Sequence, residues 1–278
     1  MKVTFWGVRG SIPTPGIETV RVGGNTPCVE VRTPDEDLLI LDAGTGIRPL
    51  GLALQAQCAD RIIGHIFLSH THWDHIQGLP FFSPARLRGN RFTILGEKRV
   101  DERLDQILAG QYVDTYLPFS LREMEADILI KEIRDRETIV IGENTLITAR
   151  RLDHPGGVFA YRICWHDMRM VYATDLRHPF DGIDERLVEL ARGADLLIHD
   201  AHFLPDETVL YPDWGHSSWL QAIEVAEASQ AKWLVLFHYN PAASDDVLEA
   251  IEREAQIRFP QTSLAREGLT IDLAKQSP

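Results

Sequence analysis

Short apolar runs recur along the whole chain and are separated by Asp, Gly and Pro, the residues that most often end regular structure. Continuous apolar runs predict buried strands, whereas apolar positions three and four apart predict helices. The helical pattern is present at residues 101–108 and again from Trp219 onward, where Ile223 and Ala226 continue the same face. The segments predicted as strands are 1–5, 39–41, 66–68, 146–152, 170–174, 196–198 and 233–237.

The length and composition fit a single domain that spans residues 1–278. Hydrophobic residues make up 44% of the chain, which is ample for a core, and we find no linker, repeat or low-complexity tract. Residues 81–137 form the least strand-like region and include the aromatic, proline-bearing segment 112–119. We expect this region to cover a pocket as a lid, with Tyr112 and Tyr116 either facing a ligand or packed in the interior.

Four metal-binding side chains occupy six positions directly after the run 66–68, namely His70, His72, Asp74 and His75. In an extended segment alternate side chains point the same way, so the first three are expected to converge and His75 to turn in from the next position. The spacing predicts two adjacent metals, one held by the two leading histidines and the other by Asp74 and His75. The alternative, a histidine-rich loop without metal, would leave costly buried polar groups unbound.

This motif resembles the HxHxDH signature of the metallo-β-lactamase superfamily. The resemblance covers nearly the whole chain, because residues 7–11 and 39–44 also match the family's opening elements. It implies an α/β fold, the αββα sandwich of two mixed β-sheets flanked by helices, with the metals at one edge where strands end. Asp42 would either hydrogen-bond a ligating histidine from behind or cap a turn.

The resemblance also implies three later ligands, and each candidate lies at the end of a predicted strand. His154 would complete the first metal, Asp175 would bridge both metals, and His238 would complete the second. A carboxylate suits the bridging position because it has two oxygens. Taken singly, each of the three is as readily a structural histidine or a turn aspartate.

Residues 196–202 and 215–218 look like the paired HEAT and HST motifs of the ribonuclease Z branch, in which a carboxylate orients a histidine facing the scissile bond. By that resemblance Asp200 orients His216, and His216 donates a proton. Aspartate stands where the branch has glutamate and His202 where it has threonine, which leaves open whether Asp200 reaches His216 directly or through a water. The alternative makes His216 the N-terminal residue of a helix that a following serine caps.

The function implied is that of a metal-dependent hydrolase, first of all a phosphodiesterase for small cyclic or nucleotide-type phosphodiesters. Asp74, Asp200 and His216 would be its catalytic residues: a hydroxide bridging two divalent ions attacks phosphorus, and His216 protonates the departing alkoxide. Two alternatives use the same ligands: a carboxylic ester, thioester or lactone hydrolase, and a non-hydrolytic di-iron sensor module. Zinc is the default metal, and manganese or iron also suits imidazole and carboxylate ligands.

The charge balance bears on the substrate. Lysine and arginine number 28 against 41 acidic residues, and the net charge of −13 repels polyanions at long range. Only 21 positions separate His154 from Asp175, too few for the long arm with which ribonuclease Z grips transfer RNA. We therefore expect a small anionic ester and no large nucleic acid. Arg9 and Arg177 are candidates for contacting it, although a solvated surface pair is the commoner fate of an arginine.

No stretch has the length of a membrane span or of a signal-peptide core, so we expect a cytoplasmic protein without membrane contact. The scattered, odd-numbered Cys28, Cys58 and Cys164 fit reduced thiols. Cys164 lies well before Asp175, so it is not the thiolate ligand of some β-lactam-hydrolysing relatives, which disfavours a β-lactamase. The oligomeric state stays open, with a homodimer among the options.

Overall fold

One sheet brings the two ends of the chain together with its first half. The computed structural model describes residues 1–57, 61–120 and 123–275, and within them seven strands pair in the order β14-β1-β2-β3-β4-β5-β6. The sheet is mixed: β14, β1, β2 and β3 pair antiparallel, whereas β3 to β6 run parallel. The strands are β1 (Lys2–Gly7), β2 (Cys28–Arg32), β3 (Leu38–Leu41), β4 (Ile63–Phe67), β5 (Arg91–Glu97), β6 (Asp127–Ile133) and β14 (Thr270–Asp272).

The second half of the chain forms another seven-stranded sheet, in the order β13-β12-β11-β10-β9-β8-β7. β7 to β10 pair antiparallel and β10 to β13 run parallel. β11 and β12 are buried at every position, as expected for parallel strands covered on both faces. The strands are β7 (Thr138–Ile141), β8 (Thr145–Leu152), β9 (Val158–Trp165), β10 (Met168–Ala173), β11 (Leu196–Asp200), β12 (Leu234–Phe237) and β13 (Thr262–Leu264).

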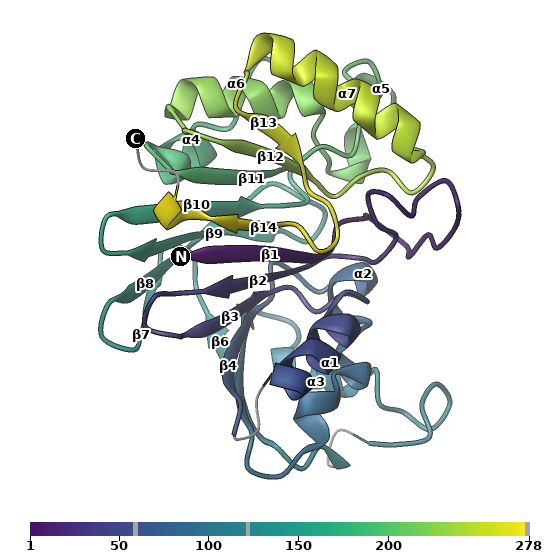
Figure 1. Cartoon of the computed structure of the whole chain (residues 1–278). Helices are drawn as coiled ribbons and strands as arrows, with labels where there is room; N and C mark the ends of the chain where they lie inside the picture. The colour runs from purple at the N-terminus through teal and green to yellow at the C-terminus, as the bar shows by residue number, and fades with distance from the viewer. Residues whose placement is uncertain (58–60, 121–122, 276–278) are drawn as a thin grey trace.

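The two sheets face each other and helices lie on their outer sides (Figure 1). Val3 and Phe5 of β1 share one apolar core with Tyr161 of β9, whereas Ile40 of β3 and Leu50 belong to a second core outside the first sheet. This arrangement confirms the αββα sandwich, because apolar side chains are buried between the sheets and again under the helices. The helices are α1 (Ile47–Gln57), α2 (Trp73–Ile76), α3 (Leu104–Ala109), α4 (Glu185–Ala191), α5 (Glu207–Leu210), α6 (Trp219–Ser229) and α7 (Asp245–Arg258).

The region 81–137 contains more sheet than its sequence pattern indicates. It supplies β5 and β6, and the alternating burial of the edge strand β6 explains why its apolar pattern is weak. Its longest part outside the sheet is the connection between these two strands, which carries α3. In that connection Tyr112 is buried, with its ring centroid 6.2 Å from that of Phe119, whereas the side chain of Tyr116 is exposed.

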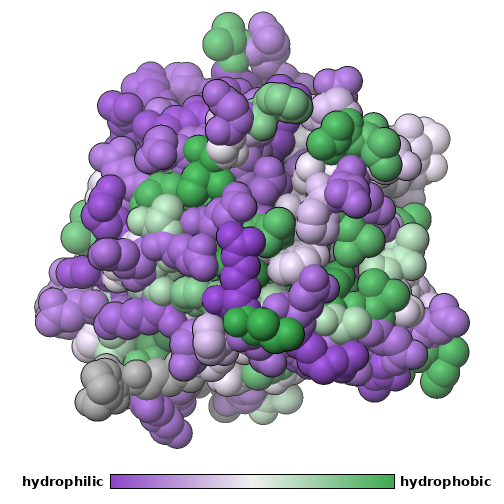
Figure 2. Space-filling model, turned by 90° about the horizontal axis from the view of Figure 1, so that it is seen from above, coloured by the Kyte–Doolittle hydropathy of each residue, from purple (hydrophilic) through white to green (hydrophobic). Residues whose placement is uncertain are grey.

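Hydrophilic side chains cover most of the face shown in Figure 2, and hydrophobic ones are scattered among them. Within the described ranges, no helix has both the length and the apolar character needed to cross a bilayer. Cys28 and Cys164 are free thiols, and Cys58 lies outside the described residues.

Candidate metal centre

The predicted ligands gather at one edge of the sandwich, just beyond the ends of strands from both sheets. His70 follows β4, His154 follows β8, Asp175 follows β10 and His238 follows β12 directly. Because β10, β11 and β12 are parallel, their carboxyl ends meet at the same edge, which is where α/β sheets usually hold ligands.

One group of ligand atoms consists of His70, His72 and His154, which we call the histidine cluster; the atoms lie within 4.8 Å of one another. Nε2 of His154 is 3.1 Å from Nδ1 of His72. Nε2 of His70 is buried and has no hydrogen-bond partner among the described residues, although it lies 3.9 Å from Oδ1 of Asp175. A divalent ion would satisfy this buried nitrogen, so the cluster fits a metal.

A second group, the carboxylate cluster, consists of Asp74, His75, Asp175 and His238. Oδ2 of Asp175 is 3.1 Å from Nε2 of His75 and 3.1 Å from Nε2 of His238. Its other oxygen faces the histidine cluster, so the carboxylate lies between the two groups, as a bridging ligand requires. Oδ2 of Asp74 lies 3.2 Å from Nε2 of His238.

The local backbone of the motif differs from the prediction. The extended pattern does not reach Asp74 and His75, because both lie in the short helix α2, which begins at Trp73. A helical turn points adjacent side chains about 100° apart, and this lets both residues face the same cluster. The predicted division into two pairs agrees with the two clusters, although the geometry that produces it is helical.

The ionisable groups of the carboxylate cluster depend on one another. Burial lowers the pKa of His75, but Asp175, Asp74 and Asp42 outweigh burial and raise that pKa well above its usual value. The three carboxylates thus place negative charge around His75, and a divalent cation bound there would neutralise that charge. In the histidine cluster, burial holds the pKa of His70 well below its usual value, which favours the neutral imidazole, the form that binds metal.

Asp42 holds His75 from behind. Its carboxylate accepts hydrogen bonds from the amide of Ser69 (2.7 Å), the hydroxyl of Ser69 (2.8 Å) and the hydroxyl of Tyr172 (2.7 Å). It also accepts from Nδ1 of His75 at 2.8 Å, which leaves Nε2 of His75 to face the cluster. Asp42 was expected either to hydrogen-bond a ligating histidine or to cap a turn. The hydrogen bond to the candidate ligand His75 is present, and Asp42 also fixes the loop through Ser69.

We expect Asp42→Ala to lower metal affinity about 10- to 100-fold, because His75 loses the partner that fixes its orientation. Competition of the loaded protein with a chromogenic chelator measures the change. Tyr172→Phe is the matched control: it removes one donor to Asp42 but leaves the bond to His75, so its loss should be much smaller. Equal affinities of Asp42→Ala and the unsubstituted protein would mean that Asp42 only supports the loop.

Asp200 contacts His216 directly. Oδ2 of Asp200 is 2.9 Å from Nδ1 of His216, so no water is needed to join them. The same oxygen accepts the amide of Asp175 at 2.9 Å, and the other oxygen accepts the amide of His202 at 2.9 Å. Burial lowers the pKa of His216, but Asp200, together with Asp175 and Asp74, outweighs burial and raises that pKa, which favours the protonated imidazole.

The helix after His216 does not use this histidine. α6 begins at Trp219, and Ser218 is its N-cap, accepting the amide of Gln221. The hydroxyl of Ser217 donates to the carbonyl of Leu176. Helix capping therefore explains Ser218 but not His216, whose side chain contacts Asp200 instead. The ring of His202 stacks on that of His216, with centroids 4.1 Å apart.

Three contacts with the site involve residues that lie in the sequence motifs but were not assigned to the metal centre. The amide of Ser11 donates to Oδ2 of Asp74 at 2.8 Å. A Cβ at Gly10 would lie 2.5 Å from the ring of His238, so only glycine fits there. The carbonyl of Gly215 lies 2.9 Å from Nδ1 of His154. The glycines were visible in the sequence, but their neighbours are more than 60 residues away along the chain.

Three residues at the site leave their strands in the left-handed region of backbone space. The φ values are 61° for Asp42, 52° for Asp175 and 60° for His238. Non-glycine residues enter this region rarely, although aspartate and histidine do so more often than most. Each turn directs a functional side chain out of a buried strand and across the edge of the sandwich.

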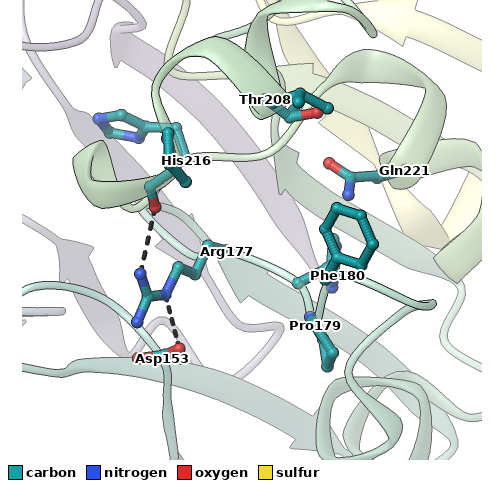
Figure 3. A pocket seen from close by; sticks show the side chains of 10 residues that line it. Asp153, Arg177, Pro179, Phe180, Thr208, His216 and Gln221 are labelled. Carbon is teal, nitrogen blue, oxygen red and sulfur yellow. Dashed lines mark hydrogen bonds and ion pairs between the residues drawn. The ribbon is translucent and has the colours of Figure 1, made fainter.

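A pocket of about 510 Å³ opens beside His216, lined by Arg177, Phe180, Thr208 and Gln221 among others (Figure 3). Arg177 lies between Asp153 and the segment before His216, donating to the carboxylate of Asp153 (2.7 Å) and the carbonyl of Pro212 (3.1 Å). Arg177, one of the two arginines expected to contact the substrate, therefore lines a pocket. Arg9 does not, because it is fully buried and paired with Asp245 at 3.3 Å.

Comparison with known proteins places this geometry in a family. Residues 38–239 match the β-lactamase superfamily domain. A ribonuclease Z from Synechococcus sp. (strain CC9311) is 26% identical over 329 residues, covering 98% of this chain and 99% of the relative. Among solved structures, the short form of human tRNase Z has a TM-score of 0.69 at 20% identity and covers 98% of this chain and 99% of that chain. A diphosphatase of the PhnP family has a TM-score of 0.69 at 20% identity, covering 98% of this chain and 97% of that chain.

The chain belongs to the β-lactamase superfamily, and the family implies divalent metal ions at the site. Within that superfamily, the predicted place in the ribonuclease Z-like branch and the prediction of a metal-dependent hydrolase are confirmed.

The prediction that excluded large nucleic acids is wrong, because the curated relative is a ribonuclease and a structural neighbour is a tRNase. The net charge of −13 is a sum over the whole chain and does not describe any one surface. The interval between His154 and Asp175 is filled by β9 and β10, so it has no room for the long arm, but a missing arm excludes only one way of binding RNA.

Proposed function

We propose that this chain is a metal-dependent phosphodiesterase that cleaves small phosphodiesters of the cyclic or nucleotide type, with His216 as the general acid. The contact of His216 with Asp200 at 2.9 Å, at the wall of the 510 Å³ pocket, carries the proposal. An acid held by a carboxylate serves a reaction whose leaving group must take up a proton, as an alkoxide leaving phosphorus does.

The proposal assigns two divalent ions to the site, one to the histidine cluster and one to the carboxylate cluster, with Asp175 shared. Zinc is the first expectation, and manganese or iron also suits this donor set. When bound, divalent ions lower the pKa of water and neutralise charge on phosphoryl oxygens.

The chain's own residues orient the reaction. Asp200 engages Nδ1 of His216, which leaves Nε2 to donate its proton to the departing oxygen. Asp200 also binds the amide of Asp175, so the acid and the bridging carboxylate keep a fixed separation. Arg177, held by Asp153, adds positive charge on the pocket side of His216.

The end of an RNA strand is a second candidate substrate, favoured by the ribonuclease Z relatives. It offers the same phosphodiester group and an equally poor leaving alkoxide. The same metal ligands and the same acid would therefore serve it, and the two substrates differ only in what lies beyond the scissile bond.

Activity of the metal-loaded protein on a panel of substrates tests the proposal. We expect hydrolysis of bis(p-nitrophenyl) phosphate and of at least one cyclic or dinucleotide diester, all abolished by a chelator. A thioester and a lactone are included because the same ligand set suits them. Turnover of these two without any diester hydrolysis would contradict the phosphodiesterase.

We expect close to two divalent ions per chain after mild loading with zinc or manganese, because seven ligand side chains exceed what one tetrahedral site uses. Elemental analysis of the desalted protein measures the ratio. A reproducible ratio near one, unchanged by further loading, would contradict the dinuclear site.

A further inference from the structure

Five arginines line one pocket outside the metal centre. They are Arg136, Arg150, Arg162, Arg186 and Arg192, and the pocket measures about 610 Å³, within the range of about 300–1,000 Å³ typical of ligand sites. It lies on the outer face of the second sheet, where α4 packs against β8 and β9. Such a concentration of guanidinium groups is unexpected in a chain with a net charge of −13.

The carboxylates around the pocket do not balance these arginines. Asp135 lies 3.0 Å from Arg150 and 3.8 Å from Arg136, and Asp184 pairs with Arg186. Glu189 is the third acidic group there. Five positive charges against three negative ones leave a local excess of positive charge.

Two of the arginines have guanidinium nitrogens left for a ligand. Nη1 of Arg162 donates to the carbonyls of Leu190 and Arg192, at the carboxyl end of α4. This anchors the side chain in the pocket wall, and within the described ranges no carboxylate lies within 4 Å of it. Arg192 is exposed and likewise has no carboxylate within 4 Å in the part of the chain that the structure describes.

We propose that this arginine pocket binds a ligand with at least two closely spaced phosphate groups. Guanidinium groups bind phosphate with paired hydrogen bonds, and several around one cavity match an anion of more than one charge. Such phosphates have two sources, the backbone of a nucleic acid strand or a free oligophosphate. The site is additional to the proposed function and does not depend on it.

The position of the pocket suits a strand that also reaches the metal centre. Arg150 of β8 precedes His154 by four residues, so at most about 14 Å of chain separates them. Arg186 lies on the same path: it pairs with Asp184, whose amide donates to Nδ1 of His178 at 3.0 Å, and His178 lines the pocket beside His216. One extended polyanion can therefore occupy both places.

Binding of two probes to the metal-loaded protein tests the site: a labelled single-stranded oligoribonucleotide and inorganic tripolyphosphate. The variant is Arg192→Gln, because this exposed side chain makes no hydrogen bond or ion pair with the residues that the structure describes. Arg253→Gln on the exposed side of α7 is the matched control, since it removes the same charge from a residue that does not line the pocket. We expect Arg192→Gln to weaken binding about tenfold and the control to leave it unchanged.

The salt dependence adds a second readout. For a single strand, the slope of log affinity against log salt should fall in magnitude by about 0.7 for the lost phosphate contact. A loss with the oligonucleotide alone supports a nucleic acid strand, and a loss with tripolyphosphate supports a free oligophosphate. Equal affinities of Arg192→Gln and Arg253→Gln for both probes would overturn the site. Hydrolysis of bis(p-nitrophenyl) phosphate in the same preparations reports separately on the proposed function.

Discussion

His216→Ala should lower turnover of an alkyl or nucleoside phosphodiester about a hundredfold or more, yet lower turnover of a nitrophenyl diester only modestly. An alkoxide must be protonated as it leaves, whereas a nitrophenolate departs without a proton. Steady-state kinetics on both substrates, with metal measured in the same preparations, gives the difference. The metal content should stay the same, because His216 belongs to neither the histidine cluster nor the carboxylate cluster; its ligand atom lies within 4.8 Å of those of His202 and His238, so the metal measurement is an essential part of the test.

Asp200→Ala provides the companion measurement. It removes the partner that orients His216 and leaves the imidazole in place, so we expect the same substrate pattern in weaker form. Because Asp200 also binds the amide of Asp175, this variant needs its own metal measurement. Equal losses on both substrates in His216→Ala would show that His216 supports structure or metal and does not act as an acid.

Asp175→Asn should reduce the metal content from near two ions per chain toward one and remove most diester turnover. A neutral amide is a poor bridge between two cations, and the carboxylate lies 3.1 Å from both His75 and His238. Elemental analysis and kinetics on one preparation measure both effects.

Thr174→Val is the matched control for that variant. The hydroxyl of Thr174 donates to Oδ2 of Asp175 at 2.6 Å, so the change removes a neighbouring hydrogen bond and keeps the charge. We expect two ions to remain. Unchanged metal and turnover in Asp175→Asn would show that the bridging role belongs elsewhere.

The convergence of the candidate ligands could be predicted from the sequence because these residues follow apolar runs. His154, Asp175 and His238 each lie at the end of a strand whose burial is visible in its composition, and parallel strands bring such ends together. The acid pair was found through two short motifs. Whether Asp200 reaches His216 directly depends on how β11 and the segment before α6 pack against each other. The spacing of residues along the sequence does not determine this packing.

The contacts behind the ligands could not be predicted. Tyr172 reaches Asp42 across 130 positions of the chain, and the amide of Ser11 reaches Asp74 across 63. Such hydrogen bonds depend on how the two sheets pack, and the donors belong to residue types found everywhere. The exclusion of nucleic acid failed for a related reason: a total charge says nothing about five arginines that the fold brings around one pocket.

The left-handed turns at Asp42, Asp175 and His238 lower the stability of the fold at positions that the proposed catalysis requires. Holding a residue other than glycine in such a conformation costs about 1–3 kcal/mol, and other contacts of the fold must offset this free energy. Glycine at 175 or 238 would relax the backbone but would delete the carboxylate or the imidazole. Under the proposed function, selection for heat resistance alone would therefore favour, at these positions, replacements that remove a metal ligand or its support, and a thermostabilised version of this enzyme would have to gain its stability elsewhere.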